Sequence, residues 1–351
     1  MDFYLFTKSR WDEAPRLRHQ IAQMLAANGH TLTFFERPTL LHRGRRVVDD
    51  KVTLVQTRWL MRGQLRVHRV LARLNNAVEK RELRRAIQGP PAIGVINFNY
   101  DYEFLRELFP QSKIVFVIND DFIDGALAPR ETARQIGATA ASSDQTIVTA
   151  YPLLDQVRGH TDHAELFLPW SRSGYNKPKS GLDRTDLIWW GYINDRIDEE
   201  AVRHVSQAGI TMHFVGPVID SAKIRRILAL KGVVRHPSSQ LKDLGAILDR
   251  CCASILPYER TFKQIGALTI NNRGFELLSY GLPLLYTDLP ALLQAPPDVI
   301  HRCATPQSFV EAHHSTRANF DLVQPSIENF LADHTPERRY AQLMGYFRTT
   351  H

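Results

Sequence analysis

Short apolar segments alternate with helical patterns along almost the whole chain, and this alternation constrains the fold most. In the first half the apolar segments are residues 2–7, 31–36, 92–97, 113–119 and 145–150. Helices are expected between them, one from Pro15 to Gly29 and a long basic one over 64–87. Short apolar runs separated by helices are typical of strands buried on both faces of a parallel sheet. The sequence therefore predicts an α/β fold.

The segment 171–185 interrupts the alternation. It is rich in Ser, Gly, Lys and Pro and almost free of apolar residues, so we expect an interdomain linker there. The pattern then restarts in the runs 186–192, 210–216, 232–237, 251–258 and 283–287, followed by a mostly helical tail from about 305. We therefore predict two Rossmann-like domains of similar size, residues 1–180 and 181–333. A cleft between two such domains is a natural place for a ligand.

Composition excludes several classes of protein. The chain of 351 residues is 44% hydrophobic and 23% charged, which is ordinary for a globular protein and unlike a disordered or fibrous one. No run approaches the ~18 apolar residues of a spanning helix, and the N-terminal apolar patch is too short for a signal peptide. We therefore expect a cytoplasmic protein. The cysteines, Cys251, Cys252 and Cys303, agree with a reducing compartment and show no metal-binding spacing.

The net charge of +7 is concentrated in one segment. Residues 37–85 hold 14 basic and 4 acidic side chains, whereas residues 181–351 hold 18 of each. A solvated face, an anionic membrane surface and a phosphorylated or nucleic-acid partner are the three interpretations, and nucleic acid is not expected. For a membrane surface, the candidate side chains are Arg43, Arg45, Arg46, Arg62, Arg66 and Arg69. In the helix over 64–87 the expected apolar stripe is Leu65, Val70, Leu71, Leu74, Val78 and Leu83.

Residues 256–290 carry the most informative pattern. Asn271 or Asn272 can cap a short helix that ends at Gly281. Unpaired amides at a helix start form an anion site, and Arg273 in the first turn adds positive charge suited to a diphosphate. Glu276 follows on the same face and suits paired ribose hydroxyls. The plain alternative is a surface Arg–Glu pair on an ordinary helix.

The run 271–290, NNRGFELLSYGLPLLYTDLP, resembles the donor-binding signature of GT-B glycosyltransferases. In that signature a basic residue, two residues, a Glu or Gln and a Gly-any-Pro segment follow in order. The run is most similar to bacterial GT4-type enzymes and to xanthan-type glucuronosyltransferases, in which a Tyr by the nucleotide base precedes the basic residue as Tyr258 precedes Arg273 here. Many GT4 enzymes also carry a Glu where this chain has Leu268. This departure favours the glucuronosyltransferase-like relatives, which are inverting.

The resemblance implies a GT-B fold with two Rossmann-like domains facing a central cleft and a helix at 334–351 returning to the first domain. It implies transfer of a sugar, as by a hexosyltransferase, from a nucleotide-diphosphate donor, a UDP-sugar, to a hydroxyl of a lipid-linked or oligosaccharide acceptor. The products would be cell-surface polysaccharide or glycolipid, and the enzyme would sit peripherally at the inner face of the plasma membrane. Neither a metal nor a cofactor is expected. The alternatives are an epimerase-like enzyme acting on nucleotide sugars and a non-catalytic GT-B-like protein that binds through residues 37–85.

Three further segments supply candidate site residues. Gly191 ends an apolar run and lets the backbone approach donor phosphates, while Arg196 can neutralise their charge. The alternative is a plain turn with Arg196 on the surface. In the loop 9–22, which in the resembling family contributes to acceptor binding, the candidates are Asp12, Arg16 and His19. The alternative there is a solvated helix start with acidic residues at its dipole.

Asp120 and Asp121 lie at the end of the run 113–119, where open α/β sheets place their ligands. Either can act as the general base of an inverting transfer, with Glu13 as the next choice. A helix cap and a metal site are the alternatives for this pair. The chain has no HExxH, GxSxG, Walker or GxGxxG motif, which argues against a zinc protease, an α/β hydrolase, a P-loop enzyme and a typical dehydrogenase.

Overall fold

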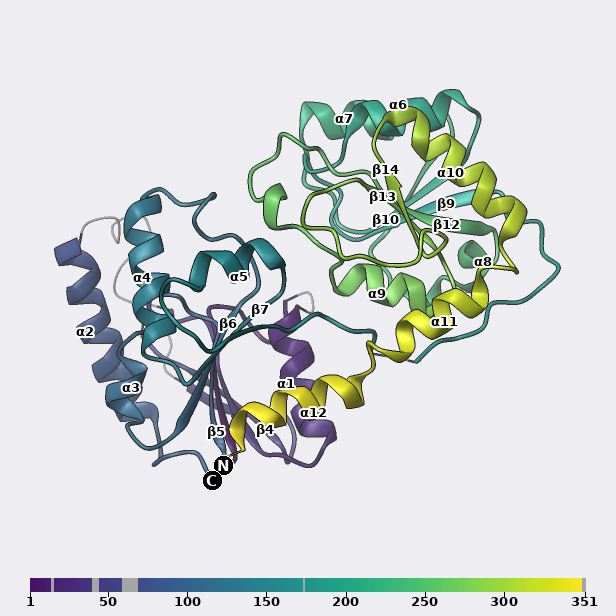
Figure 1. Cartoon of the computed structure of the whole chain (residues 1–351). Coiled ribbons are helices and arrows are strands. Elements are labelled where there is room, and N and C mark those ends of the chain that lie inside the picture. Colours follow the sequence, from purple (N-terminus) through teal and green to yellow (C-terminus); the bar gives the residue numbers. More distant parts are fainter. Residues whose placement is uncertain (14–15, 40–43, 59–68, 173, 349–351) are drawn as a thin grey trace. The chain divides into compact units, whose positions relative to one another are not determined.

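The computed structural model describes residues 1–351 except 14–15, 40–43, 59–68, 173 and 349–351. The chain divides into two compact units, each built on its own sheet (Figure 1). Unit 1 comprises Met1–Leu168 and Glu337–His351, and unit 2 comprises Pro169–Pro336. None of the described helices is long and apolar enough to cross a membrane.

The strands of unit 1 are β1 (Phe3–Phe6), β2 (Leu32–Phe35), β3 (Gly44–Val47), β4 (Val52–Gln56), β5 (Gly94–Asn97), β6 (Lys113–Ile118), β7 (Gln145–Val148) and β8 (Ala164–Leu166). They form one sheet in the order β3-β4-β2-β1-β5-β6-β7-β8, parallel except for the β3–β4 pair. The helices are α1 (Leu17–Ala27), α2 (Arg69–Ala86), α3 (Leu105–Leu108), α4 (Pro129–Ala141), α5 (Tyr151–Val157) and α12 (Pro336–Phe347).

The strands of unit 2 are β9 (Asp186–Trp190), β10 (Met212–Val215), β11 (Val233–His236), β12 (Cys251–Leu256), β13 (Leu284–Thr287) and β14 (Ile300–Cys303), in the order β11-β10-β9-β12-β13-β14. The helices are α6 (Glu199–Gln207), α7 (Ala222–Leu228), α8 (Gly245–Leu248), α9 (Asn272–Ser279), α10 (Pro306–Asn319) and α11 (Gln324–Ala332). Two short 3₁₀ turns span Leu241–Asp243 and Ile265–Ala267. Helices α6, α7 and α10 cover one face of the sheet, and α8, α9 and α11 the other (Figure 1).

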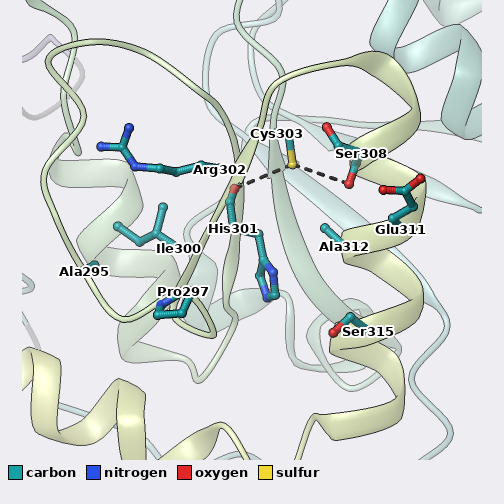
Figure 2. Close-up of a pocket in the computed structure, with 10 residues that line it drawn as sticks. All are labelled: Ala295, Pro297, Ile300, His301, Arg302, Cys303, Ser308, Glu311, Ala312 and Ser315. Atoms are coloured by element: carbon teal, nitrogen blue, oxygen red, sulfur yellow. Dashed lines mark hydrogen bonds between the residues drawn. The ribbon is translucent and has the colours of Figure 1, made fainter.

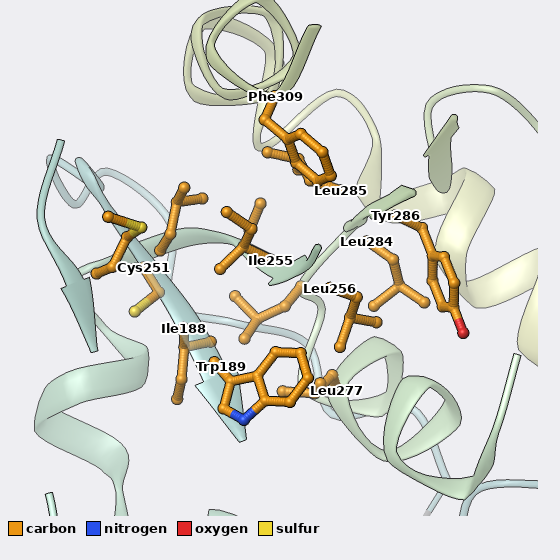
Figure 3. Close-up of a cluster of buried hydrophobic side chains, with 14 of the residues drawn as sticks. Ile188, Trp189, Cys251, Ile255, Leu256, Leu277, Leu284, Leu285, Tyr286 and Phe309 are labelled. Atoms are coloured by element: carbon orange, nitrogen blue, oxygen red, sulfur yellow. The ribbon is translucent and has the colours of Figure 1, made fainter. Parts of the chain in front are cut away.

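Both sheets have a topological switch point, where the chain turns from building one side of the sheet to building the other. In unit 1 it lies between β1 and β5, and in unit 2 between β9 and β12. Ligands of open α/β sheets bind at the carboxyl ends of the strands beside such a point. In unit 2 a hydrophobic cluster packs on this sheet, with Trp189 of β9 among Leu256, Leu277 and their neighbours (Figure 3).

The segment 171–185 packs against unit 2, although its composition is that of a linker. The Asn176 amide donates to the Ser279 carbonyl (2.7 Å), and the Tyr175 hydroxyl donates to Gln324 Oε1 (2.9 Å). The division between the units accordingly falls after Leu168, earlier than the expected 180. Residues 337–351 group with unit 1, where Phe347 contacts Phe3 with ring centroids 5.2 Å apart.

The expected apolar stripe of the long basic helix was wrong in part. The described helix α2 begins at Arg69, and Leu65 lies outside the described residues. Val70 and Leu74 are 70% and 56% exposed, whereas Asn75, Glu79 and Glu82 are buried together with Ala72 and Leu83. The helix therefore packs through a partly polar stripe. Because charged residues occur on both the buried and the exposed faces, the hydrophobic pattern does not identify the buried face.

Candidate functional site

The start of α9 is fixed by its cap. Asn271 Oδ1 accepts a hydrogen bond from the Gly274 amide (3.2 Å), and Asn271 Nδ2 lies 3.2 Å from the Tyr258 hydroxyl. Asn271 is therefore the cap, and the predicted site residue Asn272 is the first residue of the helix. The cap leaves helix amides and the positive end of the helix dipole at the carboxyl edge of the sheet, beside the switch point.

Arg273 lies against the end of β9. Its guanidinium carbon is 4.5 Å from the ring centroid of Trp189. Gly191, with φ of +134°, allows this approach, because a Cβ there would lie 2.6 Å from the guanidinium carbon. Gly216, with φ of +146°, packs in turn on the Gly191 carbonyl. Two sequence-predicted residues, Gly191 and Arg273, are thus brought into direct contact.

The guanidinium of Arg273 has unused hydrogen-bonding capacity. Its Nη1 is buried and has no hydrogen-bond partner among the described residues, and Arg273 forms no ion pair with any of them. A buried N–H that finds no acceptor is costly, and a guanidinium matches phosphate geometry. Together with the amides of the first turn of α9, this nitrogen suits the oxygens of a phosphate or diphosphate.

Glu276 does not pair with Arg273. It is 6% exposed, and its Oε1 accepts from both the backbone N and the side-chain Nε of Arg172, at 2.9 and 3.0 Å. Arg172 was missed from the sequence because it lies in the segment that composition assigns to a linker. The alternative interpretation, a surface pair between Arg273 and Glu276, is therefore wrong.

Tyr258 and Arg196 both lie beside this edge. Tyr258 is 3% exposed, and its ring meets Trp189 and Tyr286 at centroid distances of 5.7 and 5.2 Å. Arg196 Nη2 donates to Gln264 Oε1 (2.8 Å), so Arg196 holds the loop between β12 and α9. Within the described ranges, Gln264 is the one non-glycine residue with positive φ (+67°).

In unit 1, the predicted acceptor residues occupy two different environments. His19 is buried: its Nδ1 accepts from the Arg16 amide (3.1 Å), so the protonated Nε2 donates to the Arg10 carbonyl (2.9 Å). Burial lowers the pKa of His19, which keeps the ring neutral. Asp12 is exposed and 3.3 Å from Arg46, and the exposed Arg16 lies 3.6 Å from Glu13. His19 thus shapes the loop, while Asp12 and Arg16 face solvent.

The two aspartates after β6 have different surroundings. Asp121 Oδ1 accepts from the amides of Ile123 and Asp124, at 3.0 and 3.1 Å, and so closes the turn. Asp120 Oδ1 accepts from the Asp121 amide (3.0 Å), and the negative charge of Asp120 partly offsets the lowering of the Arg18 pKa by burial. Of the two carboxylates, Asp120 is therefore the better candidate for a base.

Neither of two cavities in unit 2 contains a predicted site residue. The larger, of about 470 Å³, lies between β14 and α10 and is lined by His301, Arg302, Cys303 and Glu311 among others (Figure 2). Burial raises the pKa of Cys303 to about 12, and Arg302 donates to Asp288 and to the Leu292 carbonyl. The smaller, of about 180 Å³, lies beside Arg184 and Phe320. Across the described part of the chain, no three His, Cys, Asp or Glu side chains are grouped to hold a metal.

Two Rossmann-like units, each with a mostly or wholly parallel sheet and a switch point, define the GT-B fold found in glycosyltransferases. No family model matches the sequence, and no curated protein matches it.

The fold is shared with solved structures over nearly the whole chain. An α,α-trehalose-phosphate synthase (UDP-forming) from Burkholderia xenovorans, in complex with glucose-6-phosphate, superposes with a TM-score of 0.69 at 12% identity, covering 99% of this chain and 100% of that one. The E. coli trehalose-6-phosphate structure bound with UDP-2-fluoro glucose gives 0.67 at 10% identity, covering all of both chains. Sucrose-phosphate synthase from Thermosynechococcus elongatus gives 0.66 at 12% identity, covering 97% and 94%.

Proposed function

We propose that the protein is a glycosyltransferase that moves a sugar from a UDP-sugar to an acceptor hydroxyl. The observation that carries this proposal is the placement of Arg273. Its guanidinium lies over Trp189 and Gly191, beside the capped start of α9, and keeps a buried nitrogen without a partner among the described residues. The names of the structural neighbours, one UDP-forming and one bound to a UDP-sugar analogue, support the choice of donor.

In the proposed donor site, Arg273 and the α9 amides bind the diphosphate. The bond between the anomeric carbon and the β-phosphate oxygen breaks during transfer, so negative charge grows on the departing UDP. A fixed guanidinium and helix dipole stabilise that charge more strongly in the transition state than in the ground state, which lowers the barrier. We assign Tyr258 to the base side of the nucleotide and Glu276 to the ribose hydroxyls. Arg196 supports the loop between β12 and α9.

In unit 1, Asp120 is the proposed general base. It takes the proton of the acceptor hydroxyl as that oxygen attacks the anomeric carbon, which gives inversion at that carbon.

The acceptor we propose is lipid-linked or an oligosaccharide, used in polysaccharide or glycolipid synthesis. The exposed arginines Arg45 and Arg46 of β3, and Arg69 at the start of α2, support a peripheral position at the inner face of the plasma membrane. Arg43, Arg62 and Arg66 lie outside the described residues.

The proposal is tested by measuring UDP release from a panel of UDP-sugars, with membrane extract as the source of acceptor. The wild type should release UDP from at least one donor, and Arg273→Ala should lower turnover by about 10²-fold or more, as for loss of one preorganised donor to a developing charge. Arg203→Ala is the matched control, because Arg203 is an exposed arginine of α6 that pairs with Glu199 at the surface. No UDP release from any donor, or equal turnover in Arg273→Ala and wild type, would reject the proposal.

A further inference from the structure

Arg18 of α1 is a partly buried cation with few partners. It lies beside the switch point of the unit 1 sheet. Its Nη1 donates to Ser9 Oγ (2.7 Å), and its guanidinium carbon is 5.4 Å from the ring centroid of Phe98. Its Nε is buried without a partner among the described residues, and Arg18 takes part in none of their ion pairs. Burial lowers the pKa of Arg18 to about 10, which is the expected result of holding this charge without a close counter-ion.

The half-buried Lys8 and the buried Arg184 are better satisfied. Lys8, on the segment after β1, lies 2.6 Å from both carboxylate oxygens of Asp101. Arg184 leaves its Nε unpartnered as well, but its terminal nitrogens donate to three backbone carbonyls, and one approaches Asp249 at 3.8 Å. Arg18 resembles Arg273 instead: each has a buried guanidinium nitrogen without a partner among the described residues, and each lies beside the switch point of its own sheet.

Two amide side chains at the same edge of the unit 1 sheet are unsatisfied. Asn99 follows β5, and Asn119 follows the neighbouring strand β6. Asn99 Nδ2 and Asn119 Oδ1 are both buried and have no hydrogen-bond partner within the described ranges. Buried polar atoms are nearly always hydrogen-bonded. The two unpaired amide atoms lie at the edge where open α/β sheets bind ligands, so a ligand can supply the missing partners. One amide atom can donate to a sugar hydroxyl and the other can accept from one.

We infer that Arg18, Asn99 and Asn119 form a subsite for an anionic sugar, with Arg18 on a phosphate or carboxylate group and the two amides on hydroxyls. The inference rests on the proposed function, for which this sugar is the acceptor or its terminal unit. Glu13 and Asp120 also act on the charge of Arg18, and Asp120 is the proposed base. An anion held at Arg18 therefore brings a hydroxyl of the same sugar near that carboxylate.

Calorimetric titration of the full chain, saturated with UDP, tests the inference with three probes: glucose 6-phosphate, glucuronate and neutral glucose. At least one charged sugar should bind tenfold or more tightly than glucose. Preference for the phosphate or for the carboxylate identifies which anion the site accepts. Arg18→Ala should abolish the preference and Arg18→Lys should restore part of it. Arg158→Ala should keep it, because Arg158 is an exposed arginine of unit 1 paired with Asp155.

Equal binding of charged and neutral sugars by the wild type would overturn the inference, as would an unchanged preference in Arg18→Ala. Each titration is preceded by one with UDP alone. If UDP binds the wild type and Arg18→Ala equally, a lost preference is specific to this subsite. If UDP does not bind the wild type, it is the proposed function that fails.

Discussion

At the residue scale, the proposed donor site depends on the close approach of Gly191 and Arg273. The sequence marked both, because a Gly ending an apolar run and an Arg in a first helical turn each suit an anion. The sequence could not show that Arg273 lies over the ring of Trp189 and against Gly191, because these residues are distant in the chain and meet only in the folded structure. Arg172 and Arg18 were missed for the same reason, because their significance comes from burial and from partners distant in sequence.

Replacement of Gly191 by Ala should displace Arg273. The new Cβ would lie 2.6 Å from the guanidinium carbon, so the side chain must leave Trp189, and we expect UDP affinity to fall by about tenfold or more, equivalent to about 1.4 kcal/mol. Gly209→Ala is the control, since Gly209 also has positive φ (+76°) but open space around it. Titration with UDP measures both, and equal affinity for the two variants would disprove the steric role of Gly191.

Asp120 and Asp121 should differ as bases. Asp120→Asn should lower turnover by about 10²-fold while UDP affinity is kept, because a general base contributes about that much. Asp121→Asn should keep most of the activity, since an amide oxygen still accepts from the Ile123 and Asp124 amides. Initial rates and UDP titrations check both variants. Full activity of Asp120→Asn would move the base to Glu13 or end the inverting assignment.

At the element scale, strand and helix positions followed well from hydrophobic patterns, and the apolar runs expected as strands became β1, β2, β5, β6, β7, β9, β10, β11, β12 and β13. Strands β3, β4, β8 and β14 were not predicted. Strand β3 has the charged sequence GRRV, which is exposed at the sheet edge and so lacks the apolar pattern of a buried strand. The segment 171–185 has the composition of a linker, but hydrogen bonds that composition cannot reveal join it to α9 and α11.

The pair Arg172–Glu276 allows a binding role of Glu276 to be separated from a structural one. Arg172→Ala removes the side-chain bond from Arg172 Nε to Glu276 and keeps the bond from the Arg172 backbone amide. The buried carboxylate of Glu276 then lacks its charged partner, so we expect the free energy of unfolding to fall by about 1–3 kcal/mol. If Glu276 binds ribose, UDP affinity should be kept in Arg172→Ala and lost in Glu276→Ala. Urea unfolding and UDP titration check this prediction. Equal losses of UDP affinity would mean that Glu276 acts only through the segment.

At the scale of the whole molecule, burial should make stability depend on pH. It lowers the pKa values of His19 in unit 1 and of His236, His301 and His313 in unit 2. Protonation of these rings therefore favours the unfolded chain. The free energy of unfolding should be greatest above pH 6.5 and fall as pH drops below it, before the carboxylates titrate.

Urea unfolding at pH 7.5 and 5.5 measures this dependence. His236→Asn should reduce it, because the His236 pKa is lowered by burial and by the neighbouring His213. A free energy of unfolding that stays constant or rises at the lower pH would contradict the prediction.

The basic segment should bind anionic membranes reversibly. Each Lys or Arg near such a surface contributes about 1 kcal/mol, and salt screens the attraction beyond about 8 Å. The wild type should pellet with anionic vesicles at low salt and not with neutral ones. Joint replacement of Arg45, Arg46 and Arg69 by Glu should release it, whereas the same replacement of Arg203, Arg225 and Arg226 in unit 2 should not. A wild type that stays in the supernatant with anionic vesicles would remove the membrane from the proposal.

Titration of UDP into the full chain tests the central claim most directly, because it requires neither the donor sugar nor the acceptor. We predict that the wild type binds UDP, that Arg273→Ala binds it at least tenfold more weakly, and that Arg203→Ala binds it like the wild type. No binding by the wild type, or equal binding by Arg273→Ala, would contradict the claim that unit 2 holds a nucleotide through Arg273 at the start of α9.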